Sequence, residues 1–368
     1  MSDNKSIALT MEEVCSLAKK YAIPVTDVLL IALNRYGIHA EVPDNRLRFK
    51  LKLLTCKGAF YVAVCVNTFL SPFTLHHNKL YLGSEVIGIV FDIEKDTCDS
   101  TYFRRNRTEL TLNSNMRSRC FGCTFCGTYK LDADDGFDMS SDEKIYEYIE
   151  QFMKNNGMAN LENLVRLTIC TGCFASEERL IEHILSVYRV FQQFGFNKRI
   201  RYIGSQIRSE KAMRILSEQI RSFSLSLTVE CFTNRERRMR KEKASLSIEE
   251  IKEVLARALR YNFSTNYLYI VGLDELEDMK SGIQNLSNKV NRLPVFQIMQ
   301  NYVSDHEKER VEAAKNIEYY LQARQIIEDC FKTNNYTPRI WENYRGLFLY
   351  SVSKQAITRY KDLKKVSM

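Results

Sequence analysis

The pattern of hydrophobic and polar positions along the 368-residue chain changes near residue 109. Before that point, two amphipathic helical patterns are followed by short strand patterns between Asn, Asp, Gly and Pro turn signals. Helices are expected at residues 11–20 and 26–36, and strands at 46–54, 59–66 and 86–91. These elements predict an N-terminal α+β accessory domain, or cap, over residues 1–108.

From residue 109 onward, short strand patterns alternate with longer amphipathic helical patterns, as in βα units around a parallel sheet. The expected strands are 109–112, 165–170, 199–203, 224–231, 266–271 and 295–299, and the expected helices are 141–155, 176–194, 210–220, 247–261 and 275–289. Ser247 followed by Glu250 has the form of a capping box. Six units form either a doubly wound sheet or a partial barrel, and both bind ligands at the carboxyl edge of the strands. The repeats predict a domain over 109–304 and leave 305–368 as a helical C-terminal extension.

Composition narrows the class of protein. Hydrophobic residues make up 45% and charged residues 27% of the chain, as in soluble globular proteins. No apolar run approaches the roughly 18 residues that a membrane-spanning helix needs. The polar N-terminus lacks the order of a secretion signal, so we expect a cytoplasmic protein with no membrane partner. Part of the net charge of +8 lies in residues 234–243, NRERRMRKEK, a run that suits a solvated face, a nucleic acid or a phosphorylated ligand.

Three of the eleven cysteines, Cys120, Cys123 and Cys126, are close enough in sequence to suggest a shared metal. Their C-x2-C-x2-C spacing also opens the bacterial ferredoxin run, which holds a [4Fe–4S] cluster. In ferredoxins a fourth cysteine and a proline follow, whereas Lys130 and Leu131 stand at those places here. Unless a remote cysteine closes the cluster, one iron keeps an open coordination site, as a substrate-binding cluster requires.

Zinc is the alternative metal. A structural zinc site built from cysteines usually combines two separated C-x2–4-C pairs, and Cys170 with Cys173 supplies a second pair. Such a site would leave one of the three clustered thiols over. A third interpretation is that no metal binds and the cysteines are small buried hydrophobic residues. The spacing favours an iron–sulfur cluster and leaves both alternatives open.

Over roughly residues 109–302, the chain resembles the radical S-adenosylmethionine (radical SAM) superfamily. Members have a cluster loop of the form C-x3-C-x-Φ-C after the first strand, where Φ is aromatic. Cys123-Thr124-Phe125-Cys126 matches the second half of this pattern, and Cys120 stands one residue nearer than usual. The resemblance implies an α/β fold with a partial (β/α)6 TIM-type barrel, an N-terminal α+β cap and a helical C-terminal extension. It also implies a [4Fe–4S] cluster on the three cysteines and S-adenosylmethionine as cofactor, with Phe125 beside them.

Further family landmarks follow the second and fourth strands. Thr171 and Gly172 stand where members bind the methionine amino group, although the usual Gly-Gly-Glu is absent. Glu230 stands where members place a ribose or amino-acid contact. Arg235 or Arg237 matches the cation that pairs with the methionine carboxylate in some members.

The fifth and sixth strands complete the implied cofactor site. LYIVGLDE is similar to the family's adenine-side motif G-x-I-x-G-x-x-E, in which Gly272 takes the second glycine position and Leu268 replaces the first. In FQIMQNY, Ile298 would lend backbone contacts to the adenine.

The resemblance implies an enzyme that cleaves S-adenosylmethionine reductively to a 5′-deoxyadenosyl radical, which acts on a small-molecule substrate that the residues do not identify. Flavodoxin or ferredoxin is the kind of reductant expected as a partner. Nucleic acid and peptides stay as alternative substrates because of the positive charge. The alternative function is non-catalytic: a zinc or closed ferredoxin-like cluster with a structural, sensing or electron-transfer role. No catalytic residue is assigned from the sequence.

Overall fold

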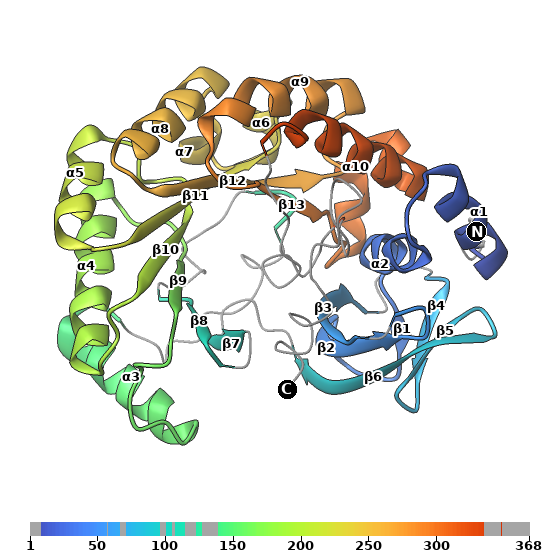
Figure 1. The fold of residues 1–368 in the computed structure, drawn as a ribbon, viewed down its shortest axis with the longest axis horizontal. Coiled ribbons are helices and arrows are strands. Elements are labelled where there is room, and N and C mark those ends of the chain that lie inside the picture. The colour runs from blue at the N-terminus through green and yellow to red at the C-terminus, as the bar shows by residue number, and fades with distance from the viewer. Residues whose placement is uncertain are drawn as a thin grey trace.

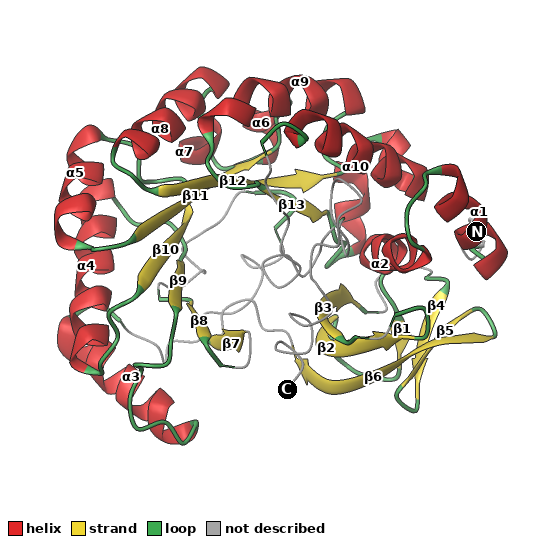
Figure 2. Cartoon of the chain, viewed as in Figure 1, coloured by secondary structure: helices red, strands yellow, loops and turns green. Residues whose placement is uncertain are grey.

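The computed structural model of the chain contains two curled sheets with helices packed around them (Figures 1 and 2), which confirms a mixed α/β fold. The structure describes residues 9–56, 58–66, 71–95, 101–104, 107–114, 123–126, 139–334 and 347.

The first sheet has six strands and is mainly antiparallel, with strand order β1-β4-β5-β6-β2-β3. Its elements are α1 (Met11–Lys20), α2 (Val25–Tyr36), β1 (His39–Ala40), β2 (Arg46–Leu53), β3 (Phe60–Cys65), β4 (Phe73–His76), β5 (Lys79–Leu82) and β6 (Glu85–Lys95). Alternate residues of β2, Leu47, Phe49 and Leu51, are buried, as expected for a strand with one covered face. The helix α2 packs against β3 and is almost entirely buried.

The second sheet has seven strands in the order β13-β12-β11-β10-β9-β8-β7. The strands are β7 (Tyr102–Arg104), β8 (Glu109–Leu112), β9 (Arg166–Cys170), β10 (Arg199–Gly204), β11 (Phe223–Glu230), β12 (Ser264–Val271) and β13 (Val295–Ile298). β8 to β13 pair in parallel in chain order, and β7 adds an antiparallel strand at the edge. The helices are α3 (Asp142–Asn155), α4 (Glu177–Gln193), α5 (Glu210–Gln219), α6 (Arg235–Arg238), α7 (Lys241–Ala244), α8 (Ile248–Arg260) and α9 (Leu276–Leu286).

The six predicted strands and five predicted helices of this region are confirmed, with ends that differ by at most a few residues. Serine side chains cap α3, α4, α5 and α8, which explains why these helices begin where they do. The predicted capping box of Ser247 and Glu250 is present at α8. Four short strands, β1, β4, β5 and β7, were not predicted. The β4–β5 turn uses His77 and Asn78, both with positive φ, rather than the Asn-Gly signal typical of such hairpins.

The second sheet has an apolar face and a polar face. Leu110, Leu167 and Ile200 are neighbours in register and belong to the main core. The opposite face carries Arg201, whose Nε donates to Ser226 Oγ at 2.8 Å, and Ser226 in turn donates to Asn266 Oδ1 at 2.6 Å. These polar side chains are buried, and their hydrogen bonds offset the cost of that burial.

The chain after β13 connects the two sheets. It forms the 3-10 turns η4 (Ser304–Glu309) and η5 (Glu312–Lys315) and the helix α10 (Ile317–Phe331), which lies between α9 and α2 (Figure 1). Arg35 of α2 pairs with Glu307 at 2.6 Å, and Gln300 Nε2 donates to Asn34 Oδ1 at 3.0 Å. The described part of the predicted extension is therefore helical, and it ties α2 to the second sheet.

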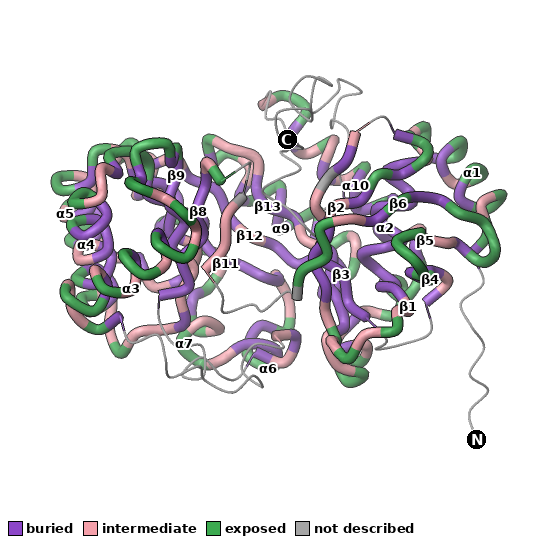
Figure 3. Tube along the Cα trace, turned by 90° about the horizontal axis from the view of Figure 1, so that it is seen from below, coloured by how far each residue is buried: buried purple, intermediate pink, exposed green. Residues whose placement is uncertain are grey.

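Burial follows the same architecture. Strands β8 to β13 of the second sheet are largely buried, whereas β4, β5 and β6 of the first sheet mix buried and exposed positions (Figure 3). Within the part of the chain that the structure describes, no helix is both long and apolar enough to span a bilayer.

The contact between α2 and α10 contains one guanidinium between two carboxylates. Arg324 pairs with Asp27, and its Nε lies 3.2 Å from Glu328 Oε1. Burial raises the pKa of Glu328 from 4.5 to about 7, although the Arg324 charge acts in the opposite direction. Glu328 is therefore a site at which the folded state takes up a proton more readily than the unfolded chain.

This raised pKa predicts a pH dependence of stability. The contribution of protonated Glu328 is fully present below pH 4.5 and is lost as the pH rises through 7, by roughly 3 kcal/mol. We expect Glu328→Gln to raise the free energy of unfolding at pH 8 and to flatten its slope between pH 5 and 8. Urea denaturation at several pH values measures both effects, with Asp329→Asn at the exposed neighbouring carboxylate as control. Equal losses of stability in both variants at pH 8 would contradict the prediction.

Candidate metal and cofactor site

The described part of the cysteine loop, residues 123–126, is anchored to the segment that follows β11. Cys126 N–H donates to Cys123 O at 3.1 Å, which closes a tight turn. Thr124 N–H donates to Arg238 O at 2.9 Å, and the Cys123 thiol accepts a hydrogen bond from the backbone N–H of Arg240. Residues 123–126 follow β8 in the chain, yet these bonds place them beside the segment after β11, which is three strands away in the sheet.

The side chains of this loop pack in a small hydrophobic cluster apart from the main core. Its buried members are Cys123, Phe125, Cys231, Met239, Ile270, Leu273 and Met299, with Cys126 packed against them. Most of these residues lie at or just beyond the carboxyl ends of β11, β12 and β13. The predicted position of the loop at the carboxyl edge of the sheet is thus confirmed for its described residues.

Of the three predicted metal ligands, the structure describes Cys123 and Cys126, whereas Cys120 lies outside the described residues. Among the described residues, no group of three or more His, Cys, Asp or Glu side chains is suitably placed to hold a metal ion. Burial raises the pKa of the Cys123 thiol, and the nearby Lys243 ammonium opposes that effect. The two thiols lie on one short turn, and the nearby cation favours their thiolate form. They therefore suit the role of two ligands of a metal group that binds thiolates.

Glu230 lies at the end of β11 in a strained backbone conformation. Its φ is +68°, and Cys231 N–H donates to Val229 O at 2.9 Å across it, so the three residues form a tight turn. The pairing of β11 with β12 shifts register at the same place. A non-glycine residue in such a conformation costs of order 1–3 kcal/mol and requires support from its surroundings.

Arg235 provides that support. Its Nη1 donates to Val229 O at 2.7 Å and to Cys231 O at 2.6 Å, so one guanidinium nitrogen binds both sides of the turn. The side chain is buried, and burial lowers its pKa. In the structure Arg235 therefore acts on the backbone around Glu230, whereas Arg237, the other predicted cation, is exposed to solvent.

Lys243 forms a buried ion pair with Glu230, and sequence reasoning missed it. The two side chains are only 14% and 12% exposed. Although burial by itself lowers the pKa of Lys243, the Glu230 carboxylate and the Cys123 thiol outweigh it, so the pKa of Lys243 is raised. Lys243 belongs to the basic run 234–243, and nothing in that run distinguishes it from exposed neighbours such as Lys241.

Asp274 is a second residue that sequence reasoning missed. It is fully buried after β12 and accepts hydrogen bonds from Phe232 N–H at 2.8 Å, Thr233 N–H at 3.0 Å and Tyr269 Oη at 2.7 Å. Arg238 Nη1 lies 3.6 Å from its carboxylate. These bonds fix the segment after β11 to the end of β12, and this is the segment that carries Arg235 and Lys243.

Gly272 follows β12, with φ at +118°. A Cβ atom there would lie 3.0 Å from Tyr320 Oη and 3.2 Å from Arg310 Nη1. Close packing against the C-terminal extension is therefore sufficient to explain why this position is glycine.

The remaining predicted cofactor residues lie at the ends of β9 and β13. Thr171 and Gly172 follow β9, and Thr171 Oγ1 donates to Gly172 O at 2.6 Å. Ile298 closes β13 with its side chain in the main core, so it can offer a ligand only its backbone. The residues gathered around the described cysteines are thus Glu230, Lys243 and the segment after β11.

The Glu230–Lys243 pair predicts a strong energetic coupling. We expect Glu230→Gln and Lys243→Met each to lower the free energy of unfolding by about 3–5 kcal/mol, because each leaves a buried charge unpaired. The double variant should lose less than the sum of the two, with a coupling above about 1 kcal/mol.

Urea denaturation of the four proteins measures this coupling. The exposed pair Lys308–Asp305, 2.9 Å apart, is the matched control, and its coupling should stay below about 1 kcal/mol. Additive losses at Glu230 and Lys243 would show that the two charges do not depend on each other.

Comparison with known proteins leaves the site to be judged on its geometry. No protein-family model matches the chain, and no curated protein matches it significantly.

Proposed function

We propose that the chain is a radical SAM enzyme with a partial (β/α)6 TIM-type barrel, whose [4Fe–4S] cluster binds to Cys120, Cys123 and Cys126. The observation that carries the proposal is the position of the Cys123–Cys126 turn. It belongs to the loop after the first of six parallel strands, yet it packs at the carboxyl ends of β11 to β13. This is the edge at which α/β folds bind ligands.

The electrostatics of the turn support this proposal. Thiolate ligands carry negative charge, and the Lys243 ammonium lies close enough to Cys123 and Cys126 to act on both. Cys123 and Phe125 are buried, which keeps water from that side of the turn. When bound, the cluster would supply the electron that splits S-adenosylmethionine into methionine and a 5′-deoxyadenosyl radical.

The chain's own residues would position the cofactor. Glu230 lies beside the cysteines, and its ion pair with Lys243 fixes the position of its carboxylate. The fixed carboxylate would accept a hydrogen bond from a hydroxyl or ammonium group of the cofactor. Arg235 and Asp274 keep the Glu230 turn in place through backbone hydrogen bonds. Thr171, Gly172, Gly272 and Ile298 would complete the site from β9, β12 and β13, with the exposed Arg237 at its rim.

The polar face of the second sheet supports a polar, small-molecule substrate. Arg201, Ser226 and Asn266 lie on the face opposite the helices, where a purely structural core would be apolar. We place the enzyme in the cytoplasm, with a flavodoxin- or ferredoxin-type reductant as its partner.

Anaerobic reconstitution with iron and sulfide tests the function. Reduction with dithionite in the presence of S-adenosylmethionine should yield 5′-deoxyadenosine, measured by liquid chromatography with mass spectrometry. We expect Cys123→Ala and Cys126→Ala to lower product formation at least a hundredfold and to reduce the iron content. Cys15→Ala, at an exposed cysteine of α1, is the control and should leave both unchanged.

The same assay separates the alternative functions. Four irons bound without cleavage under any reductant would indicate a closed cluster for electron transfer or sensing. Stoichiometric zinc without iron would indicate a structural zinc site, and loss of that zinc in Cys170→Ala or Cys173→Ala would identify its second pair of ligands.

A further inference from the structure

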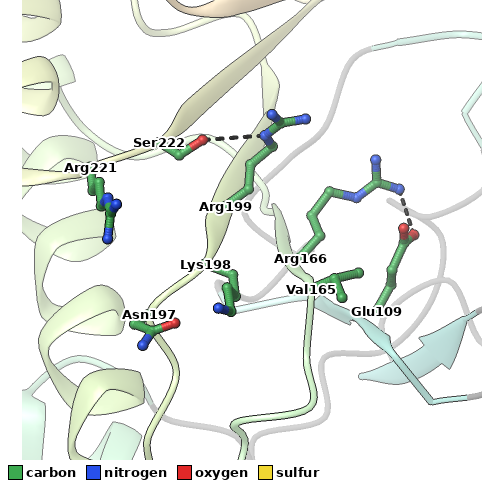
Figure 4. Close-up of a pocket in the computed structure, with 8 residues that line it drawn as sticks. All are labelled: Glu109, Val165, Arg166, Asn197, Lys198, Arg199, Arg221 and Ser222. Atoms are coloured by element: carbon green, nitrogen blue, oxygen red, sulfur yellow. Dashed lines mark hydrogen bonds and ion pairs between the residues drawn. The ribbon is translucent and has the colours of Figure 1, made fainter.

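A hollow of about 500 Å³ lies at the amino edge of the parallel sheet, opposite the edge that carries the cysteine turn. Figure 4 shows the eight residues that line it: Glu109, Val165, Arg166, Asn197, Lys198, Arg199, Arg221 and Ser222. They occupy the starts of β8, β9 and β10 and the loops that lead into β9, β10 and β11. The volume suits a small-molecule ligand.

Parallel pairing builds one wall of this hollow. Glu109, Arg166 and Arg199 are neighbours in register across β8, β9 and β10, so their side chains emerge on the same face of the sheet. Arg166 Nη2 lies 2.6 Å from Glu109 Oε2, and both side chains are buried. Their charges compensate each other, and the pair forms a fixed polar wall (Figure 4).

The charge of the remaining lining residues is entirely positive. Lys198 and Arg221 are exposed cations of the loops that lead into β10 and β11, and Arg199 is the exposed first residue of β10. Val165, Asn197 and Ser222 carry no charge. Arg199 Nε donates to Ser222 Oγ at 3.3 Å, which orients its guanidinium. Three cations around one hollow raise the local concentration of anions.

We propose that this hollow binds a phosphorylated small molecule carrying two or more phosphate groups. One phosphate carries about −1.5 to −2 charge at pH 7, so a diphosphate matches three cations where a single carboxylate does not. Arginine guanidinium groups bind phosphate oxygens in bidentate fashion, and lysine adds a point charge.

This site is separate from the cysteine site. β11 has eight residues, and at about 3.3 Å per residue it spans roughly 25 Å between the two edges. A small molecule bound at the amino edge does not reach the Cys123–Cys126 turn. The proposal therefore stands independently of the proposed radical SAM function.

A structural role for the same cations is the competing explanation. Lys198 and Arg221 follow the ends of α4 and α5, where positive charge stabilises the negative end of a helix dipole. That role requires no ligand and predicts loss of stability when the cations are removed. Phosphate binding predicts instead a loss of affinity.

Calorimetric titration of the full chain with inorganic pyrophosphate distinguishes the two. We expect saturable binding that Lys198→Gln/Arg221→Gln weakens at least tenfold, and Arg221→Gln alone weakens to an intermediate degree. Lys211→Gln/Arg214→Gln removes two exposed cations from α5 and is the matched control, expected to bind within twofold of the unaltered chain. Pyrophosphate should also raise the melting temperature of the unaltered chain and of the control, and not that of Lys198→Gln/Arg221→Gln.

Equal affinity in the pocket variant and the control would overturn the proposal, as would the absence of saturable binding. Sulfate that binds as tightly as pyrophosphate would reduce the hollow to a non-specific anion contact. A single-stranded oligonucleotide that binds more tightly than pyrophosphate through Lys198 and Arg221 would make it part of a nucleic-acid surface instead. Either result would overturn binding of a small phosphorylated ligand.

Discussion

Six parallel strands, hydrogen-bonded in chain order, bring every carboxyl end of β8 to β13 to one edge of the second sheet and every amino end to the other. Pairing in register also sorts side chains, because neighbours such as Leu110 and Leu167 must share a face. The apolar face receives the helices, which leaves a polar face with Arg201 and Ser226 on the other side. The candidate metal site and the proposed phosphate site both follow from this pairing, at opposite edges.

The buried carboxylates of Glu230 and Asp274 at the carboxyl edge are both held by specific partners. Glu230 pairs with Lys243, and Asp274 accepts four hydrogen bonds from residues of β12 and of the segment after β11. An unpaired charge in such surroundings costs several kcal/mol, so these contacts restrict the segment after β11 to a narrow range of positions. Arg235 adds hydrogen bonds that keep Glu230 in a conformation the residue would otherwise avoid. This region is preorganised, as a site that positions a cofactor requires.

The C-terminal extension couples this edge to the first sheet. Val311 N–H donates to Gly272 O at 3.1 Å, and Arg310 Nη2 donates to Met299 O at 2.6 Å, so the extension is bonded directly to the ends of β12 and β13. Arg310 and Arg35 also share Glu307, which lies between the extension and α2. Burial acts to raise the pKa of Glu307, but these two guanidinium groups lower it overall, so its charge is retained in the fold. The extension therefore connects α2 directly to the carboxyl edge of the second sheet.

The sequence alone determined the order of helices and strands, because the periodicity of hydrophobic residues and the serine caps are local properties. It predicted the six parallel strands of the second sheet, the five longer helices between them, the capping box of Ser247 and the position of the described cysteines at the carboxyl edge. It missed the short β4 and β5, whose His77–Asn78 turn carries no common hairpin signal. Only the tertiary structure decided which charges are buried. Arg235 and Lys243 turn inward while Arg237 and Lys241 face solvent. Arg235 is drawn in by the strained turn around Glu230, and Lys243 by Glu230 and the distant Cys123. The same holds for the hollow at the amino edge, because Lys198 and Arg221 are 23 positions apart and meet only through the pairing of neighbouring strands.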